Sequence, residues 1–428
     1  MKKSKFVVEG LAGQKKLAGR IRVGGAKNAV LKALAASVLF DDAVTLDNVP
    51  EIEDVARMKE LLVAAGAQVE GNTVVPPSEW DPSLDQSIAG KLRASIVMTG
   101  PMLARMGRVC FPLPGGDVIG DRPIDLFVAG FRAMGATVEI DDHQYTVIAP
   151  EGGLQGADIF FPFVSVTATE TLMMCAILAH GTTTLGNAAI EPEIIALAEY
   201  LASCGAKITG IGTPTLYIEG LGRGKLLHAE GQVFMTPPDR IETGSFVLFG
   251  ALAGAEVVVE HCNPKHVEAF LQLMKQAGVD FTVGPDSITV RGKSTPYQAV
   301  SVRTHEYPGF ATDTQAPMAV FLSQCDGEST ILETIFDGRF RYADDLVRMG
   351  ADILVMNPHK ILIRGSRALV GRDMESLDIR AGLAYLLAAT VAEGTSNIDN
   401  AYIIDRGYEH IEQRLQGLGL NIQRVEEE

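Results

Sequence analysis

The chain has 428 residues, too many for one ordinary hydrophobic core, so its length predicts two domains. Hydrophobic residues make up 47% of it and charged residues 21%, which indicates a globular and not a disordered protein. The formal net charge of −16 argues against nucleic-acid or anionic-membrane partners, whose phosphates are bound by basic surfaces. It is compatible with a small anionic ligand, because a few Lys and Arg focused in a cleft outweigh distant carboxylates.

The cysteines and the apolar stretches indicate a cytosolic protein. The five cysteines are scattered, with no CxxC pair and no metal-ligand spacing, as expected for buried thiols in a reducing compartment. The basic N-terminus is not followed by an apolar core of signal-peptide length, and the longest apolar stretch, 383–392, is too short to span a bilayer. The eight histidines do not cluster with Cys or carboxylates, so we expect no metal site and no cofactor.

A repeated pattern runs along the chain: a turn, an amphipathic helix, Gly followed by a small or apolar residue, and a short strand. The glycines that close these helices are separated by 69, 70, 73, 72 and 69 residues, and each is predicted to adopt the left-handed conformation that ends a helix. Six copies of about 71 residues fill the chain. The predicted amphipathic helices lie at 48–66, 121–135, 191–205, 263–278, 340–350 and 405–419.

Each copy also contains a second helix that is almost wholly apolar after its first turn, which is typical of a helix buried in the middle of a domain. Mixed α/β units favour closed layered lobes over an open solenoid. We therefore predict an α/β fold of two lobes with three copies each: residues 25–236, and residues 1–24 plus 237–428, with the strand at 5–9 completing the second lobe. The predicted buried helices lie at 24–40, 91–107, 164–181, 239–254, 310–325 and 378–394.

The first turns of these apolar helices are polar. Helix capping explains the Ser, Thr and Asp residues found there. It does not explain four cations, because a positive charge at a helix N-terminus opposes the helix dipole. We therefore predict an anionic ligand between the helices, held by the cations and the dipoles together. The four cations are Lys27, Arg93, Arg240 and Arg380.

The stretch 114–125 contains three glycines, two prolines, three carboxylates and one arginine, so it is neither a regular helix nor a central strand. Taken alone it is equally compatible with a solvated turn and with a loop that carries chemistry.

Seven motifs, in order along the whole chain, resemble the UDP-N-acetylglucosamine 1-carboxyvinyltransferases, the enolpyruvyl transferases that open peptidoglycan synthesis. The resemblance implies the enolpyruvyl transferase fold: two lobes, each of three βαβαββ-type repeats around buried helices (an inside-out α/β barrel), that close on substrate. The motifs are GAKNA (25–29), LRAS (92–95), PGGDVIGDRP (114–123), NAAIEPE (187–193), DRIETG (239–244), TDTQA (312–316) and IDRGYE (404–409).

The resemblance also implies a reaction. The enolpyruvyl group of phosphoenolpyruvate passes to the 3-hydroxyl of UDP-N-acetylglucosamine by addition and elimination, with release of phosphate. By the match, Lys27, Arg122 and Arg406 hold phosphoenolpyruvate, with Arg380 nearby. Asp313 is the base toward the sugar hydroxyl, and its alternative reading is a helix cap. The residues implied to meet the sugar nucleotide are Asn28, Arg93, Arg122, Pro123, Ile124, Asp125, Leu126, Phe163, Val164, Ser165, Val166, Asp239, Asp313 and Ile335.

The sequence departs from the family pattern at several places, three of which bear on the site. Most members carry Cys, the proposed proton donor and the site alkylated by fosfomycin, where this chain has Asp117. A carboxyl can donate the proton if desolvation raises its pKa, but it is a much weaker nucleophile toward an epoxide, so we predict an active enzyme that fosfomycin does not inactivate covalently. Phe163 and Phe127 stand where the family usually has Lys and His, and we expect them to form a buried aromatic pair.

Three alternatives stay open. A 5-enolpyruvylshikimate-3-phosphate synthase would carry a Gly-Ser-Lys-Ser-type segment where this chain has Gly-Ala-Lys-Asn at 25–28. A non-catalytic sensor of nucleotide sugars would need neither a base nor cations for phosphoenolpyruvate. A paralogue that uses another nucleotide sugar is suggested by Phe163 and Phe127. The sequence gives no indication of oligomeric state.

Overall fold

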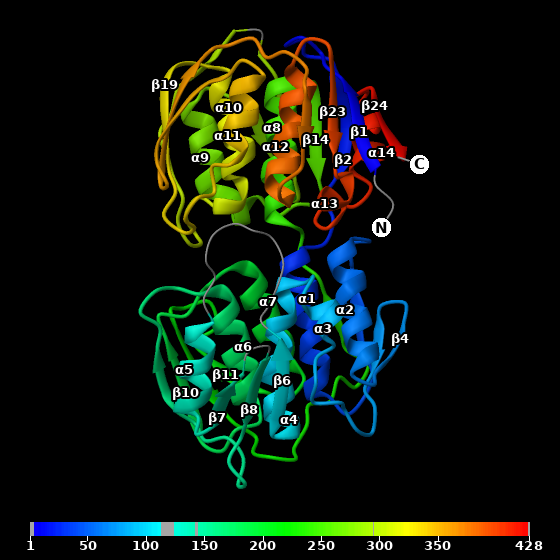
Figure 1. Ribbon diagram of the computed structural model, residues 1–428, viewed down its shortest axis with the longest axis vertical. Coiled ribbons are helices and arrows are strands. Elements are labelled where there is room, and N and C mark those ends of the chain that lie inside the picture. The colour runs from blue at the N-terminus through cyan, green and yellow to red at the C-terminus, as the bar shows by residue number, and fades with distance from the viewer. Residues whose placement is uncertain (1–3, 113–123, 142–143, 294, 427–428) are drawn as a thin grey trace. The chain divides into compact units, whose positions relative to one another are not determined.

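The computed structural model describes residues 4–112, 124–141, 144–293 and 295–426, which form two compact units (Figure 1). We call residues 25–112, 124–141 and 144–237 lobe N, and residues 4–24, 238–293 and 295–426 lobe C. Each lobe has its own hydrophobic core. None of the helices in the described residues has the length and hydropathy of a membrane span.

Lobe N contains three repeats of buried helix, surface helix and short strands among its described residues. Its helices are α1 (Lys27–Ala36), α2 (Glu53–Ala64), α3 (Gln86–Ala89), α4 (Thr99–Met106), α5 (Asp125–Ala133), α6 (Val166–Ile177) and α7 (Pro192–Ser203), with 3-10 turns η1 (Ser37–Leu39) and η2 (Arg93–Met98). Its strands are β3 (Val44–Asp47), β4 (Gln68–Glu70), β5 (Thr73–Val75), β6 (Arg108–Pro112), β7 (Thr137–Ile140), β8 (Gln144–Ile148), β9 (Asp158–Phe160), β10 (Thr182–Gly186), β11 (Lys207–Thr209), β12 (Thr215–Glu219) and β13 (Val233–Met235).

Lobe C repeats the arrangement. Its helices are α8 (Arg240–Ala253), α9 (Glu268–Gln276), α10 (Gln315–Ser323), α11 (Tyr342–Arg348), α12 (Ile379–Val391), α13 (Ala401–Asp405) and α14 (Ile411–Gly417), with 3-10 turns η3 (Pro264–Val267) and η4 (Thr312–Thr314). Its strands are β1 (Ser4–Glu9), β2 (Leu17–Arg22), β14 (Gly254–Glu260), β15 (Asp280–Val283), β16 (Ser287–Arg291), β17 (Tyr297–Gln298), β18 (Val302–Arg303), β19 (Cys325–Leu332), β20 (Asp352–Asn357), β21 (Lys360–Gly365), β22 (Asp373–Glu375), β23 (Thr395–Asp399) and β24 (Ile422–Glu426).

The apolar helices are buried and pack against one another. Every residue of α12 is buried, and so is every residue of α8 after Arg240. In lobe C, α8, α10 and α12 contact each other inside a wall of sheets (Figure 1), and in lobe N, α4 packs on α6 while α1 contacts η2. The predicted α/β fold with buried central helices is therefore confirmed.

The glycines that close the surface helices have the predicted conformation. Their φ angles are 108°, 90°, 106°, 82°, 112° and 96° at Gly66, Gly135, Gly205, Gly278, Gly350 and Gly419. A residue with Cβ is disfavoured there, because this region of φ favours glycine. The repeat thus has a local cause: each surface helix stops at a left-handed residue, and the chain turns into a strand.

Two buried helices begin later than predicted, and proline explains both. Pro101 and Pro317 are each the third residue of their helix, α4 and α10. Because proline has no N–H, the carbonyl four residues earlier receives no helical bond, which the first turn of a helix tolerates. The residues just before these helices form the 3-10 turns η2 and η4 instead, and both turns carry predicted site residues.

The strands next to the two chain crossings are exchanged between the lobes. In other copies the strand before a buried helix pairs in parallel with the strand after it, as β9 pairs with β10 and β22 with β23. At the crossings, β2 precedes α1 in the chain but pairs with β14, whereas β13 precedes α8 and pairs with β3. Each lobe therefore completes one sheet with a strand whose helix lies in the other lobe.

The first strand closes the last repeat. β1 pairs antiparallel with both β23 and β24, giving the sheet order β22-β23-β1-β24. It occupies the place that β21 has in the preceding repeat. The prediction that the strand at 5–9 completes the second lobe is confirmed.

The contact between α4 and α6 depends on Gly100. A Cβ at this position would lie 2.2 Å from the carbonyl oxygen of Thr171, so the helices must separate to admit it. We expect Gly100→Ala to lower the free energy of unfolding by about 1–3 kcal/mol, although alanine favours a helix. The matched control is Gly417→Ala in α14, where a Cβ meets nothing within 4 Å and a gain of at most about 1 kcal/mol is expected. Calorimetric unfolding of both variants measures the difference, and equal effects would contradict the packing argument.

Candidate functional site

In lobe C, two arginines hold the Asp313 carboxylate. Arg339 Nη2 donates to Asp313 Oδ1 at 2.6 Å, and Arg380 Nε lies 3.4 Å from the same oxygen. Both arginine side chains are buried, whereas the Asp313 side chain is 27% exposed. The helix-cap alternative is wrong, because the N-cap residues here, Ala311 and Thr314, make no side-chain cap bond and the Asp313 carboxylate binds arginine instead.

The charge on Asp313 is fixed. Burial alone would raise the pKa of this carboxyl, but Arg380, Arg339 and the more distant Arg240 outweigh it and hold the pKa well below its usual range. Burial likewise would lower the pKa of Arg380, yet Tyr408, Asp313 and Asp239 keep it above its ordinary value. Asp313 is therefore an ionised carboxylate that only accepts hydrogen bonds.

Tyr408 connects the second turn of α8 to the first turn of α12. Its hydroxyl accepts from Arg380 Nη1 at 3.0 Å and lies 3.3 Å from Ser245 Oγ of α8. A Cβ on Gly407 would lie 2.7 Å from Ile379, so the segment after α13 runs against the start of α12. The predicted ligand residue Arg406 is half-buried on this segment and directly precedes Gly407, whose Cβ would lie 3.9 Å from Arg380 Nη1. The structure thus brings Asp313, Arg380 and the 406–408 segment together.

Glu333 holds the turns around Asp313 in place. This carboxylate is 1% exposed and follows β19. Its Oε2 accepts from Thr312 Oγ1 at 2.7 Å and Gln315 Nε2 at 3.0 Å, which fixes the turn that bears Asp313. Its Oε1 accepts from Thr304 Oγ1 and from the backbone N–H groups of Ile335 and Phe336, which fixes the predicted ligand residue Ile335. Sequence reasoning missed Glu333; a lone acidic residue directly after a buried strand was the available signal.

The predicted ligand residue Asp239 serves as a helix cap. Its side chain accepts from the backbone N–H groups of Ile241 and Glu242 at the start of α8. Asp378 caps α12 in the same way through Arg380 and Ala381. Capping therefore accounts for these two carboxylates without a ligand.

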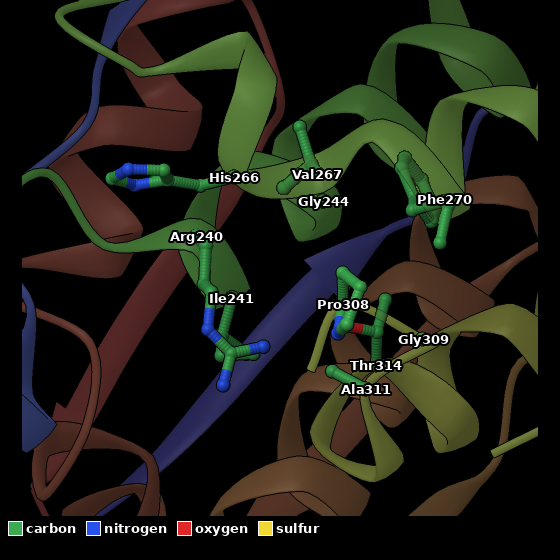
Figure 2. Close-up of a pocket in the computed structure, with 11 residues that line it drawn as sticks. Arg240, Ile241, Gly244, His266, Val267, Phe270, Pro308, Gly309, Ala311 and Thr314 are labelled. Atoms are coloured by element: carbon green, nitrogen blue, oxygen red, sulfur yellow. The ribbon is translucent and has the colours of Figure 1, made fainter. Parts of the chain in front are cut away.

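A hollow of about 310 Å³, partly open to solvent, lies beside this cluster. Figure 2 shows Arg240 and Ile241 on one side of it and Pro308, Ala311 and Thr314 on the other. Most of its lining residues are apolar in type, but polar atoms make up the larger part of its exposed surface, and it adjoins the Asp313 turn through Thr314. The other lining residues are Gly244, His266, Val267, Ala269, Phe270 and Gly309.

In lobe N, the first turns of α1, η2 and α6 carry the predicted residues Lys27, Asn28, Arg93, Ser165 and Val166. η2 contacts both α1 and α6, so packing gathers these turns. Ser165 caps α6 by accepting from the N–H of Ala168 at 3.3 Å. Val164 directly precedes this cap and is half-buried.

Lys27 has a protein carboxylate as its partner. Its Nζ lies 2.6 Å from Oδ2 of Asp54, a buried residue in the first turn of α2. Two of the four cations that indicated an anionic ligand are thus balanced by the protein: Lys27 by Asp54, and Arg380 by Asp313. Sequence reasoning missed Asp54, because an acidic residue at a helix start is also what the helix dipole favours.

The aromatic replacements do not form the expected buried pair. Phe127 is 5% exposed in the core, whereas Phe163 is 56% exposed in the loop before α6. The expectation was wrong for Phe163: in this loop the core position is taken by Phe161, which is 1% exposed, while Phe163 is exposed to solvent. Asp125 is exposed and Leu126 half-buried at the start of α5, and Ile124 is buried as its N-cap residue. Asp117, Arg122 and Pro123 lie outside the described residues.

Comparisons with known proteins give the class and then the family. The family model of EPSP synthase (3-phosphoshikimate 1-carboxyvinyltransferase) matches residues 11–415. Among solved structures, the enolpyruvyl transferase NikO from Streptomyces tendae aligns over 100% of both chains at a TM-score of 0.85 and 22% identity. EPSP synthase from Acinetobacter baumannii aligns over 99% of this chain and 100% of its own at a TM-score of 0.72 and 17% identity. The fold is that of the enolpyruvyl transferases.

Two curated relatives narrow this to one kind of transferase. UDP-N-acetylglucosamine 1-carboxyvinyltransferase from Solibacter usitatus is 42% identical, over 99% of this chain and 100% of its own. The protein of the same name from Koribacter versatilis is 41% identical, over 99% of this chain and 97% of its own. The chain belongs to the UDP-N-acetylglucosamine 1-carboxyvinyltransferase family.

Glu333 offers a sharp test of how the Asp313 turn is held. Glu333→Gln replaces one acceptor oxygen by a donor, and donors lie on both sides: Gln315 Nε2 on one, two backbone N–H groups on the other. The side-chain amide of Gln315 cannot flip freely to present its oxygen instead, because that oxygen, Oε1, accepts from the Tyr342 hydroxyl. We expect the free energy of unfolding to fall by about 1–3 kcal/mol.

The matched control for this variant is Glu328→Gln on β19, the strand that Glu333 directly follows. Its side chain is 64% exposed and paired with Arg364, so a change within about 0.5 kcal/mol is expected. Calorimetric unfolding measures the change in the free energy of unfolding for both variants, and similar changes would contradict the organising role of Glu333.

Proposed function

We propose that the protein transfers the enolpyruvyl group of phosphoenolpyruvate to the 3-hydroxyl of UDP-N-acetylglucosamine and releases phosphate. The observation that carries the proposal is family membership at 41–42% identity over nearly the whole chain. This reaction is the first committed step of peptidoglycan synthesis, and we place the protein in the cytoplasm. A paralogous reaction on another nucleotide sugar is the second candidate, favoured by the exposed Phe163.

The proposed chemistry is an addition followed by an elimination. The sugar oxygen forms a bond to C2 of phosphoenolpyruvate while the Asp117 carboxyl gives a proton to the methylene carbon. Loss of a proton from the resulting methyl group and cleavage of the C2–O bond to phosphate then restore the double bond. Lys27, Arg122 and Arg406 bind the phosphate and carboxylate of phosphoenolpyruvate. The planar guanidinium of arginine donates paired hydrogen bonds to such oxygens, and the ammonium of lysine attracts them as a compact positive charge.

Asp313 is the proposed base, and its surroundings suggest how it is controlled. A carboxylate held by Arg339 and Arg380 is a weak base, because its pKa lies well below its usual range. An anionic substrate that draws the Arg380 guanidinium toward itself would remove the largest single influence that lowers the pKa of Asp313. The pKa of Asp313 would then rise at the moment when the hydroxyl has to be deprotonated.

The test is phosphate release from phosphoenolpyruvate with UDP-N-acetylglucosamine, compared with shikimate 3-phosphate and other nucleotide sugars. We expect turnover with UDP-N-acetylglucosamine and none with shikimate 3-phosphate. Asp313→Asn should lower kcat by about 10²–10⁴-fold, because the amide cannot accept the proton. The control is Asp326→Asn, an exposed position on β19 that should leave kcat unchanged. Preference for another nucleotide sugar would establish the second candidate, and no turnover with any of them would refute transferase activity.

Fosfomycin tests the role of Asp117. We expect the wild-type protein to keep its activity during incubation with fosfomycin, because a carboxylate attacks an epoxide poorly and the five cysteines are buried. Asp117→Cys should confer progressive, irreversible loss of activity, with a mass adduct in the peptide that contains residue 117. Progressive inactivation of the wild-type protein with an adduct in the same peptide would show the prediction to be wrong.

A further inference from the structure

Lobe N contains a buried ion pair between two of its apolar helices. Lys32 Nζ of α1 lies 3.3 Å from Glu170 Oε2 of α6. The two side chains are 7% and 0% exposed. Their neighbours along the helices, such as Leu31, Ala33 and Leu172, are buried and apolar.

Stability does not account for this pair. Removing two charges from water costs more than their attraction returns unless other hydrogen bonds complete the site, and a well-packed apolar pair is often as stable or more so. Neither oxygen of Glu170 accepts a hydrogen bond by distance and angle from the described residues. A buried ion pair that lowers stability must have another role. The best-attested role is to fix the register in which two helices pack.

The pair reaches the first turns that carry the predicted ligand residues. The Lys32 side chain runs back along α1, and its Nζ also donates to the backbone oxygen of Asn28 at 2.9 Å. On the other helix, Thr169 Oγ1, next to Glu170, donates to the oxygen of Ser165 and accepts from the N–H of Ala189. The ion pair therefore joins the turn of Lys27 and Asn28 to the turn of Ser165.

The charge of Glu170 is not fixed at neutral pH. Burial raises the pKa of its carboxyl to about 7; Lys32 opposes this rise, and Glu193 and Glu191 at the start of α7 add to it. Of the other elements packed on α6, α4 and α5 present glycine at the contact (Gly100 meets Thr171, and Gly130 meets Leu172), and the 3-10 turn η2 carries the cation Arg93 at its start. The charged groups that shift the pKa of Glu170 are Lys32, Glu191 and Glu193.

We propose that Lys32 and Glu170 are positioning residues, which hold the first turns of α1 and α6 in register so that Lys27 and Asn28 meet the anionic substrate. The role rests on the proposed function. It assigns the pair to substrate binding and not to the chemical step. Loss of the pair should therefore raise KM, with kcat changed much less.

The central experiment replaces the pair by apolar residues. We expect the double variant Lys32→Met, Glu170→Met to melt at or above the wild-type temperature, because the desolvation cost is gone. Its KM for phosphoenolpyruvate should nonetheless rise about tenfold or more, since small displacements of binding groups are costly. A double variant with wild-type KM would overturn the proposal. Should the Met variant fail to fold, the near-isosteric Glu170→Gln carries the same expectation and the same refutation.

The pH dependence gives a second readout, which a purely structural role would not show. Above pH 7 the Glu170 carboxylate is ionised and holds Lys32, so the wild type should have a lower KM than Glu170→Gln. Below pH 7 the carboxyl is protonated and resembles the amide, so the two KM values should converge. A KM ratio that stays constant from pH 6 to 8 would contradict the proposal.

A rise in pH should lower the stability of the wild type, whereas it should improve its affinity for substrate. Between the ordinary value of 4.5 and about 7, the folded state binds more protons at Glu170 than the unfolded state does. Stability from this group is therefore lost as pH rises through that window, and the wild type should lose Tm relative to Glu170→Gln. A relative gain in Tm would mean that Glu170 is not a protonated, buried acid near neutral pH.

Hydrogen exchange separates failure of this proposal from failure of the proposed function. In the double Met variant, we expect faster amide exchange in peptides covering 26–31 and 164–170 than in the wild type, with unchanged exchange in α12 as internal control. This measurement needs no turnover. Absence of transferase activity in the wild type would refute the function alone, whereas unchanged exchange in both peptides would refute the positioning role alone.

Discussion

The arrangement of polar residues depends on one constraint: the central helices are buried on every side. A helix such as α12, with every residue buried, has no solvated polar face, and its first turn is where its backbone still needs hydrogen-bond partners. There the free backbone N–H groups require acceptors, which Asp378 and Asp239 supply for α12 and α8. Because the helices also contact one another, their first turns come together. The cluster around Asp313 is thus a result of packing, assembled from segments far apart in the chain.

Two buried side chains around the cluster, Glu333 and Arg339, hold it in place. Glu333 fixes the turn of Thr312 and Gln315, and Arg339, six residues further along, binds both Thr312 and Asp313. One short segment after β19 therefore supplies the carboxylate that shapes the turn and a guanidinium that sets the charge of Asp313. The same segment thus fixes the position of Asp313 and contributes to its lowered pKa, which gives a role to two buried charged groups, Glu333 and Arg339, within seven residues.

The sequence was sufficient to predict what local rules determine. The αL glycines and the apolar helices follow from residue type and spacing alone. The Pro237-Pro238 pair likewise indicated where the chain crosses from one lobe to the other. Pro101 and Pro317 would also have predicted the delayed helix starts had their missing N–H groups been considered. Long-range partners were out of reach: Asp54, Glu333 and Glu170 look like ordinary acidic residues until the fold brings them to Lys27, Thr312 and Lys32. Phe163 shows a different limit, since apolar character alone does not ensure burial.

Two carboxylates show that charged neighbours decide whether the effect of burial on the pKa of an acid is overcome. Burial is the largest single influence on both Asp313 and Glu170, and in both it favours the neutral acid. Asp313 has three arginines around it, and its pKa is lowered; Glu170 has one lysine and two further carboxylates, and its pKa is raised. Lobe C therefore presents a permanent negative charge, whereas lobe N contains one that depends on pH near neutrality. An ionised carboxylate suits the proposed base, because it is ready to accept the hydroxyl proton once the substrate draws Arg380 away from it. A changeable charge suits a group away from the reacting atoms, where it alters the fit of helices without altering the reaction.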